Sequence, residues 1–297
     1  MKTLSVLIKR NTKLFFKDKA MFFTSLITPA ILLLLYSTFL GKVYRDSFDL
    51  ASPPGFTFPD QLADGFVASQ IMGAILSVSC ITVAFCSNML MVQDKAGHTI
   101  KDLTISPVKR STLAVSYYIS TIISTVIVIF TAAAICLFYV HIKGWYLSAE
   151  DVFFLFLDSF LLVLFGTALS SVINIFVSTQ GQMQAISTIV SSGYGFICGA
   201  YMPIASFSEG LQKAISFLPG TYGTGIIRNH CLGGYFSEMK KTGVPDEVIE
   251  GMKDGIDYNL YFNGHSVELS TMYMVMLVSI LVLLLVYIAL HRIKKAR

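Results

Sequence analysis

The sequence predicts an all-α integral membrane protein with six transmembrane helices in one domain, residues 1–297. Of the 297 residues, 54% are hydrophobic and only 13% are charged, and the mean hydropathy is +0.68. Soluble domains carry about 25% charged residues. The apolar residues also gather in uncharged runs of the length that crosses a bilayer as a helix, about 20 residues.

The first element is an amphipathic helix over residues 1–19. Its lysines and arginine fall largely elsewhere around the helix than the residues of its regularly spaced face. Leu4, Leu7, Ile8, Asn11 and Phe15 recur at helical spacing. A basic amphipathic helix ahead of a span suits the headgroup region of a membrane. A simple cationic anchor for the first span is the alternative.

The six spans follow from the uncharged runs. The first run is bounded by Lys19 and Lys42, and Pro29 should bend it. The second and third lie in uncharged runs of 29 and 30 residues, and a later run of 50 is long enough for two spans. The spans are expected at about residues 20–41, 66–92, 111–140, 152–177, 183–202 and 269–290. A loop over residues 42–64 would join the first two.

A polar stretch, Gln93 to Arg110, separates the second and third spans. It is expected to form a short helix with Ile100 and Leu103 on one side, and Pro107 should stop it. The stretch carries four basic and two acidic residues. It is either an ordinary loop or a docking element that passes force between a soluble partner and the membrane part.

The segment 203–268, between the last two spans, is too apolar for an exposed loop. Residues 206–217 are amphipathic, Pro219-Gly220 interrupts them, and residues 221–232 are again apolar. Both pieces are too short to span, so a re-entrant helical hairpin is expected. Residues 245–253 should form a further short helix.

The distribution of charge predicts the orientation. Six spans place both termini on one side, which then carries 14 of the 22 Lys and Arg residues but only 3 of the 18 acidic ones. The positive-inside rule places this side in the cytoplasm and segment 203–268 outside.

Two spans carry stripes of small or polar residues. The second has Ser69, Gly73, Ser77 and Asn88 near one face, and the fifth has Ser187, Ser191 and Gly195 at intervals of four. Such stripes indicate either close helix packing or the lining of a transport path.

The sequence shows no active site. It contains no phosphate-binding G-x-x-x-x-G-K-[ST] motif, no H-E-x-x-H and no His or Cys set at metal-ligand spacing. The five histidines read as polar residues near membrane edges, and the five cysteines suggest no disulfide framework. Asp158, inside the fourth span, is a functional candidate by its depth, or pairs with Lys143.

These features resemble the membrane subunit of a type-2 ABC exporter, the bacterial permease family of drug-efflux and polysaccharide-export systems. The resemblance covers nearly the whole chain, with His98 where the family usually has glycine. It rests on these motifs: Asp94-Lys95, Thr99-Ile100-Lys101-Asp102-Leu103, Ser106-Pro107-Val108, Gly199-Ala200-Tyr201-Met202-Pro203-Ile204, Leu211-Gln212, Phe217-Leu218-Pro219 and Arg228.

The resemblance implies a division of labour. Two permease copies, as a homodimer in the bacterial plasma membrane, would work with two copies of a separate P-loop ATPase that holds Mg-ATP. This chain would be no enzyme, and would bind no cofactor and no nucleic acid. The second and fifth spans would flank the path.

The resemblance also assigns residues. Those that couple to the ATPase would be Asp94, Lys95, Thr99, Ile100, Lys101, Asp102, Leu103 and Pro107. Those of an outer gate would be Met202, Pro203, Phe217, Pro219, Gly220 and Arg228.

The expected cargo is a hydrophobic or amphiphilic molecule, such as a drug, an antibiotic or a lipid-like compound, because the path has few fixed charges. Lipid-linked polysaccharide is the alternative within the family. An ion-coupled secondary transporter is less favoured, because no inverted repeat is evident and the spans hold few titratable residues.

Overall fold

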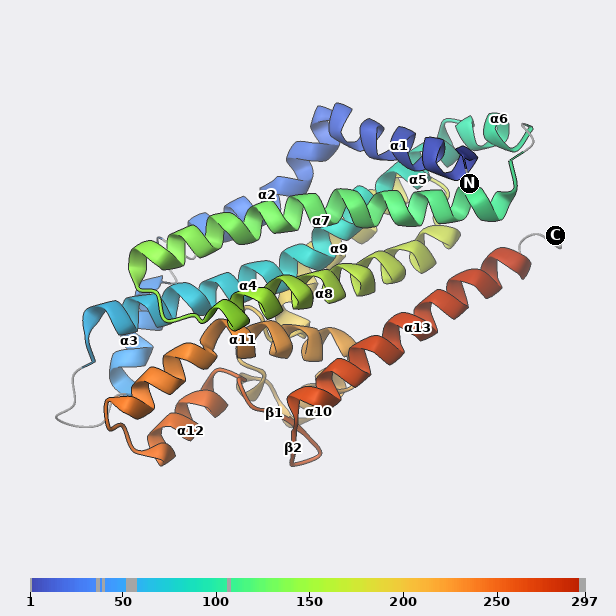
Figure 1. Cartoon of the computed structure of the whole chain (residues 1–297). Helices are drawn as coiled ribbons and strands as arrows, with labels where there is room; N and C mark the ends of the chain where they lie inside the picture. The colour runs from blue at the N-terminus through green and yellow to red at the C-terminus, as the bar shows by residue number, and fades with distance from the viewer. Residues whose placement is uncertain (1, 36–37, 39–40, 52–57, 106–107, 294–297) are drawn as a thin grey trace.

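The computed structural model of the chain describes residues 2–35, 38, 41–51, 58–105 and 108–293. Long helices form a bundle, and shorter helices gather at its two ends (Figure 1). The elements are α1 (Lys2–Lys17), α2 (Lys19–Leu35), α3 (Gly41–Ala51), α4 (Asp60–Ser87), α5 (Met89–Ala96), α6 (Thr99–Ile105), α7 (Arg110–Lys143), α8 (Ala149–Phe176), α9 (Gln180–Ile197), η2 (Ile204–Ser206), α10 (Glu209–Ser216), α11 (Pro219–Lys241), α12 (Asp246–Gly255), β1 (Leu260–Phe262), β2 (His265–Val267) and α13 (Leu269–Ile293).

The expected class, an all-α membrane protein, is confirmed. Within the described residues, four helical stretches are long and apolar enough to cross a membrane: α4 with α5, α7, α8 and α13. A fifth is obtained if α1 and α2, which meet at a bend of 73°, are counted together. The α9 helix, with three glutamines near its start, is not among them. The count of six spans therefore stays a prediction.

α4 lies at the centre of the bundle. It packs against α2, α7, α8, α9 and α11, and 94% of its most apolar stretch is buried. The large side chains of Ile71, Ile75, Leu76 and Ile81 are at most 1% exposed. Because α4 is covered on all sides by its own chain, the other long helices and α11 are arranged around it.

The long second span is broken at Asn88, between α4 and α5. The Asn88 side-chain nitrogen donates to Ser170 Oγ at 2.9 Å and Ser171 Oγ at 3.0 Å. Asn174 donates in turn to the Asn88 carbonyl at 3.0 Å. These partners on α8 satisfy the polar groups that a break exposes inside a membrane protein.

Two spans begin three residues earlier than expected, because their first turns are capped. Ser148 and Asp151 form a reciprocal capping box at the start of α8. Thr179 and Gln182 do the same at the start of α9. α9 also ends before the expected residue 202, because Gly199 has a φ of +71° and turns the chain.

Two elements were not expected. The loop predicted over residues 42–64 contains α3 and the first turn of α4. A two-stranded antiparallel hairpin, β1–β2, follows α12 and pairs Phe262 with His265. Its turn residues Asn263 and Gly264 have φ values of +48° and +81°, as a tight hairpin turn requires. The Asn-Gly pair was the sequence signal for this turn.

α10 and α11 meet at the expected break before Pro219, and the re-entrant character of this segment stays a prediction. α11 is longer than predicted and continues to Lys241. Near its start, Gly223 lies against Leu162 in the middle of α8. Further along, the Tyr235 hydroxyl donates to the carbonyl of Gly144, just after α7, at 2.7 Å. α11 therefore begins about half-way along α8 and rises to one end of the bundle.

The bundle has two distinct ends (Figure 1). One carries α1, α5 and α6, and α13 also ends there; we call it the α6 end. The other carries α3, α12 and the β hairpin, and we call it the α12 end. The described residues that sequence reasoning singled out for coupling lie at the first, and those singled out for a gate lie at or near the second.

Candidate functional site

α6 is a short helix that projects from the α6 end of the bundle. It starts directly after His98, whose φ of +62° turns the chain out of α5. Ile105 is 85% exposed, and Asp102 is exposed as well. Ile100 and Leu103, expected to face a partner, are half-buried and pack against the chain's own core. The exposed apolar side chain of α6 is therefore Ile105, which sequence reasoning missed.

The remaining expected coupling residues do not all lie on α6. Thr99 is half-buried at its first position. Pro107 and the side chain of Lys101 lie outside the described residues. Asp94 and Lys95 belong to α5 rather than to α6.

Asp94 is a buried carboxylate that joins three helices. Arg10 on α1 approaches it with both guanidinium nitrogens, at 2.7 and 3.3 Å. The hydroxyl of Tyr117 on α7 donates to the same carboxylate. A two-pronged Arg–carboxylate contact fixes geometry as well as charge. Asp94 thus holds the base of the α6 segment to α1 and α7.

Lys95 makes the corresponding contact to α8. Its Nζ donates to the carbonyl of Asn174 at 2.5 Å and approaches that of Val177 at 3.5 Å. These carbonyls lie at the carboxyl end of α8, where the helix dipole favours a cation. Adjacent residues of α5 therefore contact α1, α7 and α8.

The apolar face of α1 is covered by protein. Leu7, Asn11 and Phe15 are buried, and Phe15 is only 1% exposed. Asn11 donates to Ser116 on α7 at 3.4 Å. Because this face packs on α7, α1 is part of a junction with α5 and α7. The placement of α1 in the headgroup region, or its role as a simple anchor of the first span, stays a prediction.

The stripe on α4 is fully inside the chain. Ser69 donates to the Tyr235 hydroxyl at 3.0 Å, and Gly73 lies beside Cys231 on α11. Ser77 donates to the carbonyl of Gly73. Together with the Asn88 contacts to α8, these contacts show close helix packing along this stripe.

The stripe on α9 is divided. Ser187 and Gly195 are buried, and Ser191 is half-buried. Gly195 lies against the ring of Tyr201, in the connector that follows the helix. The neighbouring face of α9 presents polar side chains outward, with Gln184, Thr188 and Ser192 all exposed. α9 thus offers an open polar face that α4 does not.

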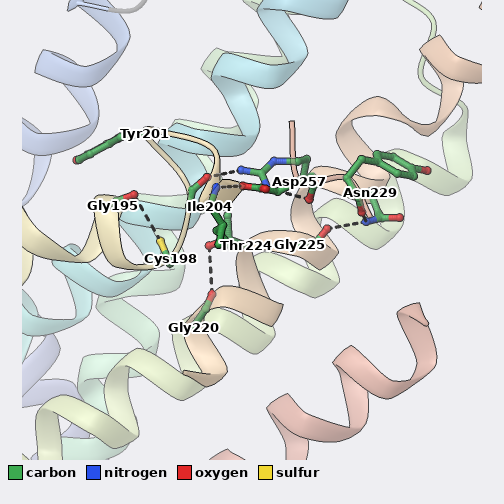
Figure 2. A network of polar contacts seen from close by, with 12 residues as sticks. Gly195, Cys198, Tyr201, Ile204, Gly220, Thr224, Gly225, Asn229 and Asp257 are labelled. Atoms are coloured by element: carbon green, nitrogen blue, oxygen red, sulfur yellow. Dashed lines mark hydrogen bonds and ion pairs between the residues drawn. The ribbon is translucent and has the colours of Figure 1, made fainter. Parts of the chain in front are cut away.

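Arg228 on α11 is the centre of a polar network near the α12 end. Figure 2 shows Ile204 and Asp257 within this network. The Arg228 guanidinium donates to the carbonyl of Gly199 at 2.5 Å and to that of Asp257 at 3.0 Å. Its Nη1 lies 3.8 Å from the Asp257 carboxylate. That carboxylate also accepts the backbone N–H of Ile204 at 2.7 Å. One arginine therefore joins α11, the α9–η2 connector and the segment after α12.

The network is buried. Arg228 is 8% exposed and Asp257 is 5% exposed. Burial raises the pKa of Asp257, and the nearby Arg228 charge only partly opposes that shift. Sequence reasoning singled out Arg228 but missed Asp257, because 29 residues separate the two and no periodicity links them.

The other expected gate residues lie on α11, at the end of α10 or in the connector after α9. Gly220 lies against Tyr194 on α9, whose hydroxyl is 3.4 Å from the Gly220 carbonyl. Pro219 is the first residue of α11. Phe217 is 69% exposed and Met202 41% exposed. Pro203 leads into η2.

Asp158 has different neighbours from those expected. It contacts His230 on α11 at 2.6 Å, whereas Lys143 lies 3.8 Å from Asp64. His230 is thereby a partner of a buried carboxylate and not an isolated polar residue at the membrane edge. Within the described part of the chain, no three His, Cys, Asp or Glu side chains gather as metal ligands would.

These features define a class: a multi-pass helical membrane protein with polar networks at two ends. The family of ABC-2 type transporters matches residues 2–230 of the sequence. That match covers more than half of the chain, so the chain belongs to this family, as its permease subunit. Such a permease is a transport subunit, and the family implies an ATP-binding partner subunit. No curated protein matches the chain.

Proposed function

We propose that the chain is the permease of an ATP-driven exporter that moves a hydrophobic or amphiphilic molecule out of the cell. A separate P-loop ATPase, in two copies and with Mg-ATP, would supply the energy, and a second copy of this chain would complete the path. The observation that carries the proposal is α6, with Ile105 85% exposed above a buried charged base.

The exposure of α6 supports docking. A helix of seven residues is too short to be stable by itself, so packing must come from elsewhere. Ile100 and Leu103 supply part of it from within the chain. Ile105 is then the apolar anchor for a groove on the ATPase, and exposed Asp102 is a rim charge.

The contacts of α5 supply a route for force. A push on α6 reaches Asp94 and Lys95, which together hold α1, α7 and α8. Helices that are joined by packed or hydrogen-bonded side chains move together, because protein interiors are close-packed. Movement of the ATPase would thus shift three helices at once.

The network around Arg228 supports a gate at the α12 end. It holds the connector after α9 against α11, at the point where the re-entrant hairpin meets the bundle. Moving α9 away from α11 must break the bonds of Arg228 to Gly199 and of Ile204 to Asp257. We therefore assign opening to this contact.

The transport path is best placed along α9. Its outward face carries Gln184, Thr188 and Ser192, which can bind polar parts of a cargo, beside exposed Ile189 and Phe196. A second permease copy facing this surface would close the path. The mixture of polar and apolar groups suits an amphiphile such as a drug, an antibiotic or a lipid-like compound. Lipid-linked polysaccharide is the alternative cargo.

The charge bias supports an orientation in which both termini and α6 face the bacterial cytoplasm and the α12 end faces outside. A cysteine at Ser237, exposed on α11, should then react with an impermeant maleimide added to intact cells. Labelling only after lysis would reverse the orientation and remove α6 from the reach of a cytoplasmic ATPase.

The test of the function is reconstitution. Inside-out vesicles that hold the chain and its ATP-binding subunit should accumulate a fluorescent amphiphile only with Mg-ATP. Vesicles with the chain alone, or with an ATPase disabled in its P-loop, should not. Accumulation driven by an ion gradient without ATP would contradict the proposal and favour a secondary transporter.

A further inference from the structure

A cavity lies between α3, the start of α4 and the end of α7, at the α12 end of the bundle (Figure 1). Its volume is about 360 Å³, and its described lining residues do not come from α6, α9 or α11. Charged side chains of both signs form its rim: Lys42, Arg45 and Asp46 on α3, Asp64 on α4 and Lys143 on α7. The cavity is therefore separate from the groups assigned to docking and to the gate.

The walls of the cavity change from charged to apolar toward the interior of the bundle. On α4, Val67 and Ala68 lie about one turn inward of Asp64. On α7, Tyr139 lies about one turn inward of Lys143. α4 starts and α7 ends at this end of the bundle, so both changes run in the same direction. A phospholipid has the same order of groups, with a charged headgroup above its acyl chains.

The end of α7 places the cavity at the boundary of the membrane. α7 is one of the helices long and apolar enough to cross a membrane, and Lys143 is its last residue. Trp145 follows two residues later and is 41% exposed. Tryptophan is enriched where a membrane meets water. The charged rim therefore lies at the level of lipid headgroups.

The arginine of the rim is already paired within the protein. Its Nη1 lies 2.6 Å from the Asp64 carboxylate, and its Nη2 lies 2.8 Å from that of Asp60. The Arg45 side chain is 26% exposed, so it is half-buried between these acids. The two contacts hold α3 against the start of α4. These three residues therefore shape the cavity and are left out of the binding groups.

Two cations and one anion of the rim remain available for a ligand. Lys143 Nζ is 3.8 Å from Asp64, which is too far for a hydrogen bond. Lys42 and Asp46 are exposed, and among the described residues neither has an ion-pair partner. Two ammonium groups suit a phosphate, and a carboxylate suits a primary ammonium group.

We propose that this cavity binds a phospholipid through a phosphoethanolamine headgroup. The phosphate accepts hydrogen bonds from Lys42 and Lys143, and the ammonium group donates to Asp46. The first carbons of the acyl chains lie over Val67 and Tyr139. A choline headgroup has no N–H to donate, and a glycerol headgroup has no cation, so each satisfies fewer of these groups. The inference goes beyond the proposed function and does not depend on it, since the lipid joins α3 to α7 whatever the cargo is.

Native mass spectrometry of the full chain measures this binding. The delipidated protein in detergent is titrated with dioleoyl phosphatidylethanolamine, phosphatidylcholine or phosphatidylglycerol, which have identical acyl chains. We expect the ethanolamine lipid to bind about tenfold more tightly than the choline lipid, as one hydrogen bond between charged groups gives. An excess of free phosphoethanolamine should leave the lipid bound, because it lacks the chains that cover the apolar walls.

Two variants separate the parts of the headgroup. Lys42→Gln combined with Lys143→Gln should weaken the ethanolamine and choline lipids alike, by about tenfold or more, because both carry the phosphate. Asp46→Asn should bring the ratio of ethanolamine to choline affinity toward one and leave choline binding unchanged. All three side chains are exposed, so these changes should not disturb folding.

Matched controls lie at the same end of the bundle. Lys213→Gln on α10 and Glu247→Gln on α12 change exposed charges outside the cavity and should leave all three affinities as they are. A preference for phosphatidylglycerol that Lys213→Gln also lowers would show general attraction to a cationic surface and would overturn the site.

Three further results would overturn the proposal. They are equal binding of the ethanolamine and choline lipids by the native chain, unchanged affinities in the double lysine variant, and displacement of the lipid by an equal concentration of free phosphoethanolamine. The last result would identify a soluble ligand instead. Binding requires neither ATP nor cargo, so the lipid site and the exporter function can fail separately.

Discussion

The two ends of the bundle differ in which side chains they expose and which they bury. At the α6 end, the charged contacts lie at the base of α6, and Ile105 projects outward with 85% exposure. At the α12 end, Arg228 and Asp257 are 8% and 5% exposed and turn toward each other. An exposed anchor gains energy only from a partner, whereas a buried network is complete within the chain. The first arrangement suits docking and the second a closed gate.

Substitutions at the two ends should therefore differ in their effect on stability. Truncating a buried ionic group leaves its partner charged and desolvated. Changing an exposed side chain on a surface helix alters stability by about 0.5 kcal/mol or less. Stability and partner binding are therefore the two readouts that separate the ends.

The largest effect is expected at the α12 end. Arg228→Ala removes the partner of Asp257 and the donor to the Gly199 carbonyl. We expect a loss of about 3–5 kcal/mol, as for other broken buried pairs. Thermal unfolding in detergent measures it.

A double variant provides the control for Arg228. Arg228→Met with Asp257→Asn removes both charges, so it should recover much of the loss seen in Arg228→Ala. If the double variant is as unstable as the two single losses added together, the pair is not the source of the effect.

A smaller effect is expected at the base of α6. Asp94→Ala removes the acceptor of Arg10 and Tyr117, and hydrogen bonds to charged groups are worth about 1.5–3 kcal/mol. Because the joint carries force, ATP hydrolysis should continue while transport falls. Equal losses of hydrolysis and transport would show that Asp94 serves docking or folding instead.

The smallest effect concerns pH. Burial raises the pKa of Asp257, so between the ordinary Asp value of about 3.9 and the raised one the folded chain keeps a proton that the unfolded chain has lost. Stability from this group is present below that window and is lost as the pH rises through it. Asp257→Asn should flatten this part of a plot of melting temperature against pH. An unchanged slope would assign it to other groups.

Much of the fold was predictable because apolar runs fix helices in a membrane. The positions of α7, α8 and α13, the break at Pro219 and the short helix α6 all follow from uncharged length or from proline. The starts of α8 and α9 were predicted three residues late, although the capping boxes at Ser148 and Thr179 were visible in the sequence.

The pairings inside the bundle were not predictable, because no periodic spacing links residues on different helices. Asp158 and His230 are 72 residues apart, and Arg10 and Asp94 are 84 apart. The orientation of α6 was also undetermined, since seven residues give too few turns to distinguish one face from another. Only the packing shows that Ile105, rather than Ile100, is outermost.

The most direct test of the account compares one substitution at each end. Ile105→Asp should leave the melting temperature unchanged and weaken co-purification of the ATP-binding subunit by about 30-fold, as loss of a hot-spot contact of about 2 kcal/mol gives. Gly220→Val places a side chain where the Tyr194 hydroxyl lies, so it should lower transport while the ATP-binding subunit still co-purifies. The opposite pattern, with Ile105→Asp retaining the subunit and Gly220→Val releasing it, would contradict the assignment of docking to α6 and of gating to the α12 end.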